Sequence, residues 1–571
     1  MWITALKQRN KYSLKAIFWL VAILLGALQA GANRYNISSD DGISYLDIGD
    51  AYFRGEWNTA INAQWSPIYS WLLGLALYVF KPSPYWEFSV VKLVNFLIYL
   101  FAIVCFEFFL SELRFHYLQS SPGSPNKFFK IPEWAWVVLG YTLFIWSSLE
   151  WLSLYSDTPD ICTAALVYLA SGIILRVQTR PSWFNFIILG VILGFAYLSK
   201  TVMFPLAFVF LAVAMFSVGK LQRALPRAFV ALLAFTIITS PFIVAISTKK
   251  GYLTYGDTGK LNYAFLINPG FPVLDDHHWQ GGPPGSGTPK HPTRMIFENP
   301  AVFEFATPIG GTYPPWYDPT YWYEGLTLKF NLVNQVKTAA KNFVFYYKRF
   351  LGSLVFGYLI VVGTCGNFWL SIKDLTKSWR LLIPAAAGLS AYMLYSDLQL
   401  TFMETQPSTR LIAVFVVLLF AGVFSSVRLP NSQEAKRLVA AMTIAVLVIV
   451  ASHFSFQASK DLSTILKGQE HTSWQVAEGL RQLGIQPGDR VAMFTDKYSH
   501  SNWARLARVK IVAEIPDANG FWKKDAIVKD QVLKTVEKTG ARILVNKPES
   551  EIVFTGWQEI SNTGYYVYFL R

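Results

Sequence analysis

The sequence predicts an all-α polytopic membrane protein with about eleven transmembrane helices and a small C-terminal α/β domain. The first observation is composition: the 571-residue chain is 53% hydrophobic and only 15% charged, whereas soluble proteins carry about 25% charged residues. The second is that apolar runs long enough to cross a bilayer core of about 30 Å recur along most of the chain. The third is a change after about residue 457, where charged and apolar residues alternate.

Each long apolar run predicts one span, and the first is a retained span because no convincing small-residue cleavage site follows it. The run 68–80 is too short to cross and is bounded by Pro67 and Lys81-Pro82, which is typical of an interfacial or re-entrant helix. The expected spans lie near residues 17–32, 88–110, 133–151, 159–175, 183–199, 201–219, 228–246, 351–371, 381–397, 411–427 and 438–456.

Lys and Arg cluster in the short loops between these spans, and with about eleven spans every such loop falls on one side. Because Lys and Arg are enriched in cytoplasmic loops, we expect the N-terminus to be cytoplasmic. We expect the membrane to be the cell inner (plasma) membrane. The formal charge of +14 is then a topology signal rather than a nucleic-acid-binding stripe. We expect a membrane domain over residues 1–456, whose loops 34–87 and 247–345 lie outside, and an extracytoplasmic α/β domain over residues 457–571.

The first outer loop carries an acidic and aromatic segment, Ser38–Phe53, in which Ser39 or Asp40 can cap a helix that runs to about Arg54. Adjacent carboxylates beside a membrane cost solvation energy unless they do chemistry or meet a cation. The alternative is that Asp40 and Asp41 only cap the helix. Such a helix places four residues on one face, namely Asp41, Tyr45, Ile48 and Tyr52.

The other carboxylates of this segment have a plainer interpretation. Asp47 and Asp50 are expected on a solvated face of the helix, where Asp50 and Arg54 can form an ion pair four residues apart. These two aspartates are therefore left out of the candidate site.

The second outer loop is rich in Gly, Pro, Trp and Tyr, most densely over Tyr313–Gly325. Aromatic faces beside carboxylates suit a sugar, whose C–H faces stack while its hydroxyls form hydrogen bonds. An equally good interpretation is a loop that packs its own aromatic rings over the helices. The loop also holds Asp276, His277, His278 and His291. Their spacing matches no zinc signature, so no metal site is predicted, while a divalent metal cofactor is left open.

The tail alternates between helical and strand-like patterns, which is typical of a small α/β domain. It has no Gly-rich phosphate loop and no catalytic constellation. We expect it to pack on the outer face or to bind an acceptor or a partner. Helices are expected near residues 474–483 and 525–539, and strands near 490–494, 509–515, 542–545 and 565–570.

Several short motifs follow one another on the outer side: Asp41-Gly42 with Tyr45, Trp65–Tyr69, Asp157–Ala165, Leu198–Lys200 and Glu404–Arg410. In order and sidedness they resemble the GT-C superfamily of membrane glycosyltransferases, in particular the bacterial branch related to protein O-mannosyltransferases and lipid A aminoarabinose transferases. The resemblance covers roughly residues 15–430. Family members usually have Asp-Glu in the first outer loop, whereas here Gly42 follows Asp41 and Asp40 precedes it.

The resemblance implies transfer of a sugar from a polyprenyl-phosphate donor to an acceptor hydroxyl of a glycan, lipid or protein on the outer face. It implies that Asp41 is the general base, supported by Asp40, and that one displacement inverts the anomeric carbon. Lys200 and Arg410 are expected to bind the departing phosphate, their alternative role being to reach lipid headgroups. The residues expected to hold substrate are Tyr45, Trp65, Asp157 and Glu404.

Two other classes of function stay open. A polytopic transporter or lipid flippase would carry charged residues in mid-span and show two matching halves, whereas here the charges concentrate at one face and no repeat is evident. A non-catalytic glycan-binding membrane protein would use the aromatic loop and the tail for recognition alone. Donor-dependent sugar transfer by the purified protein in lipid separates all three.

Overall fold

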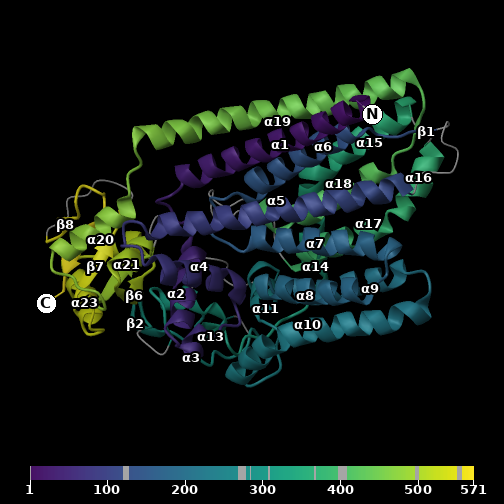
Figure 1. Cartoon of the computed structure of the whole chain (residues 1–571). Coiled ribbons are helices and arrows are strands. Elements are labelled where there is room, and N and C mark those ends of the chain that lie inside the picture. The colour runs from purple at the N-terminus through teal and green to yellow at the C-terminus, as the bar shows by residue number, and fades with distance from the viewer. Residues whose placement is uncertain are drawn as a thin grey trace. The chain divides into compact units, whose positions relative to one another are not determined.

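The contacts within the chain divide it into two compact units, each of which is discontinuous in sequence (Figure 1). The helical unit comprises Met1–Asn33, Asn95–Val244 and Gln335–Gly468, and the loop–tail unit comprises Arg34–Val94, Ala245–Asn334 and Gln469–Arg571. The predicted division at residues 456 and 457 stays a prediction. The computed structural model describes residues 2–119, 128–267, 278–282, 285–305, 309–365, 368–395, 408–495, 501–548 and 556–570.

The helical unit is built from long apolar helices that pack on one another, with α7, α8 and α9 side by side (Figure 1). Three helices run from one unit into the other: α5 (Glu87–Gln119), α10 (Leu221–Lys250) and α14 (Leu332–Tyr346). The remaining helices of this unit are α1 (Trp2–Ala32), α6 (Glu133–Trp146), α7 (Asp160–Thr179), α8 (Trp183–Ser199), α9 (Met203–Ser217), α15 (Gly352–Cys365), α16 (Phe368–Lys377), α17 (Trp379–Tyr395), α18 (Ala413–Ser426) and α19 (Gln433–Lys467).

Short segments complete these helices. A π-helical turn, Ser147–Leu152, extends α6, and another, Tyr347–Leu351, joins α14 to α15. A 3₁₀ turn, Ser408–Leu411, precedes α18. Strand β1 (Phe128–Phe129) pairs with β4 (Leu429–Pro430) in a two-stranded antiparallel ladder.

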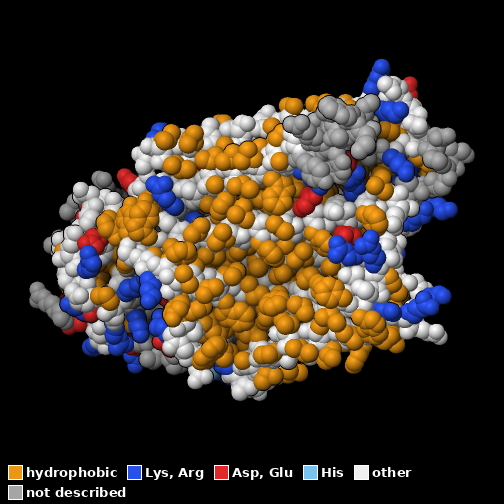
Figure 2. Space-filling model, in the orientation of Figure 1, with side chains coloured by type: hydrophobic (Ala, Val, Ile, Leu, Met, Phe, Trp, Pro, Cys, Tyr) orange, Lys and Arg blue, Asp and Glu red, His pale blue; other side chains and the backbone are white. Residues whose placement is uncertain are grey.

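The predicted fold class is confirmed. Within the described residues, seven helices are long and apolar enough to cross a membrane, and α8, α9 and α18 are shorter apolar helices. Figure 2 shows hydrophobic side chains spread over the face of these helices, where a soluble protein would present polar groups. Of the expected span 351–371, the structure describes α15 up to Cys365 and α16 from Phe368. The last span is longer than expected and continues to Lys467.

Charged residues stand at both ends of the helices in the helical unit. Helix α7 begins at Asp160 and α8 ends at Ser199, so Asp160 and Lys200 share one end. At the other end, Arg380 at the start of α17 donates to Ser217 Oγ at the end of α9, with a distance of 3.1 Å. Which end faces the cytoplasm stays a prediction.

In the loop–tail unit, α2 (Asp40–Phe53) packs closely on α4 (Pro67–Phe80). The approach is possible because glycines face each other: a Cβ on Gly49 would lie 2.6 Å from the Ser70 carbonyl oxygen, and a Cβ on Gly74 would lie 2.6 Å from the Gly49 carbonyl oxygen. The short helix α3 (Trp57–Ala60) lies between them in sequence. This contact anchors the acidic helix of the first outer loop on the short apolar helix that the sequence predicted.

A mixed seven-stranded sheet forms the core of the loop–tail unit, in the order β2-β3-β6-β5-β7-β9-β8. Strand β5 is parallel to both β6 and β7, and the other pairs are antiparallel. The tail supplies β5 (Arg490–Phe494), β6 (Lys510–Ile515), β7 (Ile543–Asn546), β8 (Gln558–Glu559) and β9 (Tyr566–Phe569), with helices α20 (Thr472–Gln482), α21 (Asn502–Ala507), α22 (Ala518–Trp522) and α23 (Ala526–Glu537).

The middle loop adds the other two strands, β2 (Arg294–Glu298) and β3 (Ala301–Glu304). It also forms helices α11 (Thr258–Leu266), α12 (Pro314–Tyr317) and α13 (Pro319–Trp322). Aromatic residues of the loop, including Trp279, Tyr313 and Trp322, are buried in one cluster with tail residues such as Trp503. These rings therefore serve as core, although they pack against the tail rather than over the helices as the plainer interpretation of the loop expects.

Candidate functional site

The acidic segment of the first outer loop folds as the helix α2 that the sequence predicted. Ser39 stands at the N-cap position with an extended backbone (φ −170°), and Asp40 and Asp41 occupy the first turn. Negative side chains are stabilised there by the helix dipole. Ser39, rather than Asp40 or Asp41, holds the cap position. Asp40 and Asp41 instead make hydrogen bonds to other segments of the chain, so they are not only caps.

One face of α2 is bound by the tail. The Asp40 carboxylate accepts hydrogen bonds from the backbone N–H of Ser501 at 3.2 Å and from its hydroxyl at 2.5 Å. Further along α2, Asp47 and Asp50 contact Arg505 of α21 at 2.7 and 2.6 Å. Spacings of seven and three residues place these three carboxylates on the same stripe of the helix.

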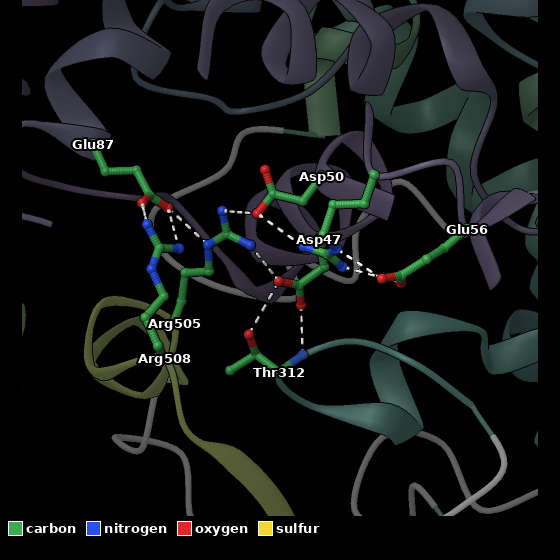
Figure 3. Close-up of polar contacts among 8 residues, drawn as sticks. Asp47, Asp50, Glu56, Glu87, Thr312, Arg505 and Arg508 are labelled. Carbon is green, nitrogen blue, oxygen red and sulfur yellow. Dashed lines mark hydrogen bonds and ion pairs between the residues drawn. The ribbon is translucent and has the colours of Figure 1, made fainter. Parts of the chain in front are cut away.

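Arg505 is the centre of a buried ion cluster (Figure 3). Its Nε also donates to Glu87 at 2.7 Å, and Glu87 in turn accepts from Arg508. Asp47 additionally accepts from the backbone N–H of Thr312 at 2.6 Å. We call Arg505, Asp47, Asp50, Glu87 and Arg508 the arginine cluster.

The expectation that Asp47 lies on a solvated face is wrong, because its side chain is buried against Arg505 and Thr312. The expected pair of Asp50 with Arg54 is present at 3.9 Å, but Asp50 also contacts Arg505. The spacing of these acids predicted the local ion pair of Asp50 with Arg54. It could not predict their contacts with Arg505, which comes from a distant segment of the chain.

Burial and charge act in opposite directions on the arginine cluster. Burial lowers the pKa of Arg505, but the carboxylates of Glu87, Asp50 and Asp47 outweigh burial and hold the pKa well above its usual value. Burial raises the pKa of Asp47 by more than Arg505 and the Thr312 N–H lower it, so the pKa lies above its usual value. The ionised state of Asp47 therefore depends on its partners.

The other face of α2 meets aromatic residues. The Trp316 indole N–H donates to Asp41 Oδ1 at 2.8 Å, and the Trp65 indole N–H donates to the Trp316 carbonyl oxygen at 3.3 Å. Tyr45 is buried and packs edge-on against Trp65 and Tyr69, with both centroid distances 5.1 Å. Three predicted site residues, Asp41, Tyr45 and Trp65, are thus brought together, and the middle loop adds Trp316.

In the helical unit, Lys200 and Arg410 meet on Asp160. Lys200 follows the last residue of α8 and pairs with Asp160 Oδ1, and Arg410 Nη1 lies 3.2 Å from Asp160 Oδ2. The hydroxyl of Thr158 donates to the same carboxylate at 2.8 Å. Side-chain exposure is 21% for Lys200, 18% for Arg410 and 5% for Asp160. We call Asp160, Lys200 and Arg410 the lysine–arginine cluster.

Asp160 was not among the residues predicted for the site. A signal was present, since it shares the outer turn of Asp157 and opens an expected span. Asp157 itself is fully buried and accepts from Asn95 Nδ2 at 3.1 Å. Glu404 lies outside the described residues.

The predicted site residues are divided between the units. Asp40, Asp41, Tyr45 and Trp65 belong to the loop–tail unit, whereas Asp157, Lys200 and Arg410 belong to the helical unit. Their convergence in a single cavity stays a prediction.

The histidines of the middle loop have carboxylate partners. His278 pairs with buried Glu514, which also accepts from the Tyr313 hydroxyl at 2.6 Å. His291 Nε2 lies 2.9 Å from Glu324 Oε2. Among the described residues, which leave out Asp276 and His277, no three metal-ligating side chains form a group. The absence of a metal site stays a prediction.

Comparison with known proteins gives only distant structural likeness. No protein-family model matches the chain, and no curated protein sequence does. The structure is similar to that of ArnT from Cupriavidus metallidurans, with a TM-score of 0.40, 11% identity, and coverage of 99% of this chain and 98% of that one. It is also similar to the Archaeoglobus fulgidus oligosaccharyltransferase, with a TM-score of 0.45, 13% identity, and coverage of 93% and 69%. Both TM-scores lie below 0.5, and no residue role follows from either alignment.

Proposed function

We propose that this chain is a membrane glycosyltransferase of the GT-C type that moves a sugar from a polyprenyl-phosphate donor to an acceptor hydroxyl on the extracytoplasmic face. The observation that carries the proposal is the lysine–arginine cluster, in which Lys200 and Arg410 come from distant segments to one end of the helical unit. The sequence resemblance predicts both as ligands of the donor phosphate.

The charge of the lysine–arginine cluster suits a phosphate. Two cations share one carboxylate, so the three side chains together carry a formal charge of +1. Lys200 and Arg410 each keep about a fifth of their side-chain surface exposed, while Asp160 is buried beneath them. Preorganised cations at the end of apolar helices stabilise the negative charge that develops on a departing phosphate.

Contacts in the loop–tail unit favour Asp41 over Asp40 as the general base. Asp40 is bound by Ser501 on the tail-facing stripe of α2, whereas Asp41 lies among aromatic residues and is oriented by the Trp316 indole. In the proposed step, Asp41 takes the proton of the acceptor hydroxyl and the hydroxyl oxygen bonds to the anomeric carbon. The bond from that carbon to the phosphate oxygen breaks, the lipid phosphate leaves, and the configuration inverts.

The aromatic residues around Asp41 suit a sugar. Trp65 and Trp316 lie at 60° to each other with ring centroids 6.3 Å apart, and Tyr45 packs against Trp65. Rings of this kind stack on the C–H faces of sugars while carboxylates accept from the hydroxyls. We assign Tyr45 and Trp65 to holding substrate beside Asp41.

The test begins with cell-envelope glycans compared with and without the gene, which identify the missing linkage. Purified protein in lipid nanodiscs is then assayed for that linkage as wild type, as Asp41→Asn and as Asp530→Asn, a matched change at an exposed tail residue. We expect Asp41→Asn to abolish transfer and Asp530→Asn to leave it unchanged. Full activity in Asp41→Asn would refute the base assignment, and movement of the lipid-linked sugar without a new linkage would indicate a flippase.

A further inference from the structure

A groove in the helical unit lies among α8, α9 and α10, close to the loop that joins α9 to α10. Its volume is about 720 Å³, which falls within the range of small-ligand pockets. Figure 2 shows hydrophobic side chains over these helices and Lys and Arg side chains gathered at the end where α9 meets α10. The groove is lined by apolar residues that include Trp183, Phe208, Met215, Leu225, Phe229 and Leu232.

Arg227 stands at the edge of this groove in a fixed orientation. Its guanidinium carbon lies 5.1 Å from the ring centroid of Trp183, which itself lines the groove. Its Nη1 donates to the Arg223 carbonyl oxygen. Its Nε is buried and has no hydrogen-bond partner among the described residues. A buried N–H of this kind is costly unless an acceptor reaches it.

The surroundings of Arg227 are positively charged. Lys220 and Arg223 are exposed within two turns of it, and the segment 217–230 contains no acidic residue. Basic pockets between transmembrane helices bind anionic lipid headgroups, and each Lys or Arg contributes about 1 kcal/mol near a charged membrane surface.

We propose that this groove is a binding site for a phospholipid with an anionic headgroup. One acyl chain lies along the apolar wall formed by α9 and α10, and the phosphate pairs with the guanidinium of Arg227, with Lys220 and Arg223 nearby. The site lies at the opposite end of the helical unit from the lysine–arginine cluster, and it does not depend on the proposed transferase function.

The alternative for Arg227 is that it reaches the headgroup layer as any interfacial arginine does. That alternative predicts that lipid retention does not depend on the shape of the groove. It also predicts that replacing another arginine at the same end of the helices lowers retention equally. Arg437, exposed near the start of α19, provides that comparison. Ala212, an exposed residue of α9 that lines the groove, allows the groove to be filled without changing any charge.

The experiment measures lipid retention by native mass spectrometry after reconstitution in nanodiscs of equimolar phosphatidylglycerol and phosphatidylcholine. We expect wild type to retain phosphatidylglycerol preferentially, and Arg227→Gln to reduce its occupancy about fivefold or more, as loss of about 1 kcal/mol implies. Ala212→Phe is expected to reduce it similarly, and Arg437→Gln to leave it unchanged. Equal retention of the two lipids, an equal loss in Arg437→Gln, or no effect of Ala212→Phe would each overturn the proposal.

Discussion

The two ion clusters of this protein have opposite composition. In the arginine cluster three carboxylates surround Arg505, which is 5% exposed, and one of them, Glu87, also pairs with Arg508. In the lysine–arginine cluster two cations share Asp160 and stay partly exposed. Burying charges costs more than their attraction returns unless every partner is present. The arginine cluster therefore behaves as a closed structural element, whereas anion binding by the lysine–arginine cluster stays a proposal that rests on its partly exposed cations.

The largest effect is expected from Arg505→Met. It leaves buried Asp47 and Glu87 and half-buried Asp50 near one another without their common cation, which costs about 3–5 kcal/mol for a broken buried ion pair. The thermal melting of the purified protein measures this loss. Arg481→Met removes an exposed pair with Glu478, which is worth less than about 1 kcal/mol, and serves as the control. Equal melting temperatures for the two variants would show that the arginine cluster is not structural.

The second effect concerns the lysine–arginine cluster. Lys200→Glu removes one charged hydrogen-bond donor and adds a repelling carboxylate, so we expect kcat/KM for the lipid donor to fall about a hundredfold, or about 3 kcal/mol. The melting temperature is expected to fall as well, because buried Asp160 loses one of its two cations, so the kinetics are measured well below the melting temperature of the variant. Lys436→Glu, an exposed change on α19, is the control. Unchanged donor kinetics in Lys200→Glu would remove this residue from the phosphate site.

A smaller effect is expected from Glu87→Gln. The amide keeps one oxygen that can accept from Arg505, but its NH₂ group then opposes Arg508, and Asp47 and Asp50 still hold Arg505. We expect a loss of about 2 kcal/mol, less than for Arg505→Met. Comparing the two melting temperatures tests whether the three carboxylates share the charge of Arg505. A loss as large as that of Arg505→Met would show that Glu87 alone carries the interaction.

The smallest effect is expected from salt. Raising the ionic strength from about 0.05 to about 0.5 M screens exposed charges more than buried ones. We therefore expect the donor KM to rise a few-fold while the melting temperature of the wild type stays nearly constant. A donor KM that does not respond to salt would contradict phosphate binding by partly exposed cations.

Much of the fold was predictable because its signals are local. The apolar runs correspond to helices, the acidic segment of the first loop is a helix from Asp40 to Phe53, and the tail contains the expected helices and strands. The hairpin of β2 and β3 was not predicted, because its strands are only five and four residues long and β3 joins the sheet through β6 of the tail, which lies far away in sequence. The burial of Asp47 was not predicted for the same reason, because its partner Arg505 is 458 positions further along the chain.

The sequence by itself determined where the chain is apolar enough to enter a membrane, which loops are basic, and that Asp41, Lys200 and Arg410 merit attention. These properties depend on neighbouring residues and on periodicity. Only the tertiary structure decided which charges meet: Asp160 with both cations, and Arg505 with three carboxylates. A side chain's electrostatic environment is set by groups within a few ångströms, and in a folded chain those groups come from any distance along the sequence.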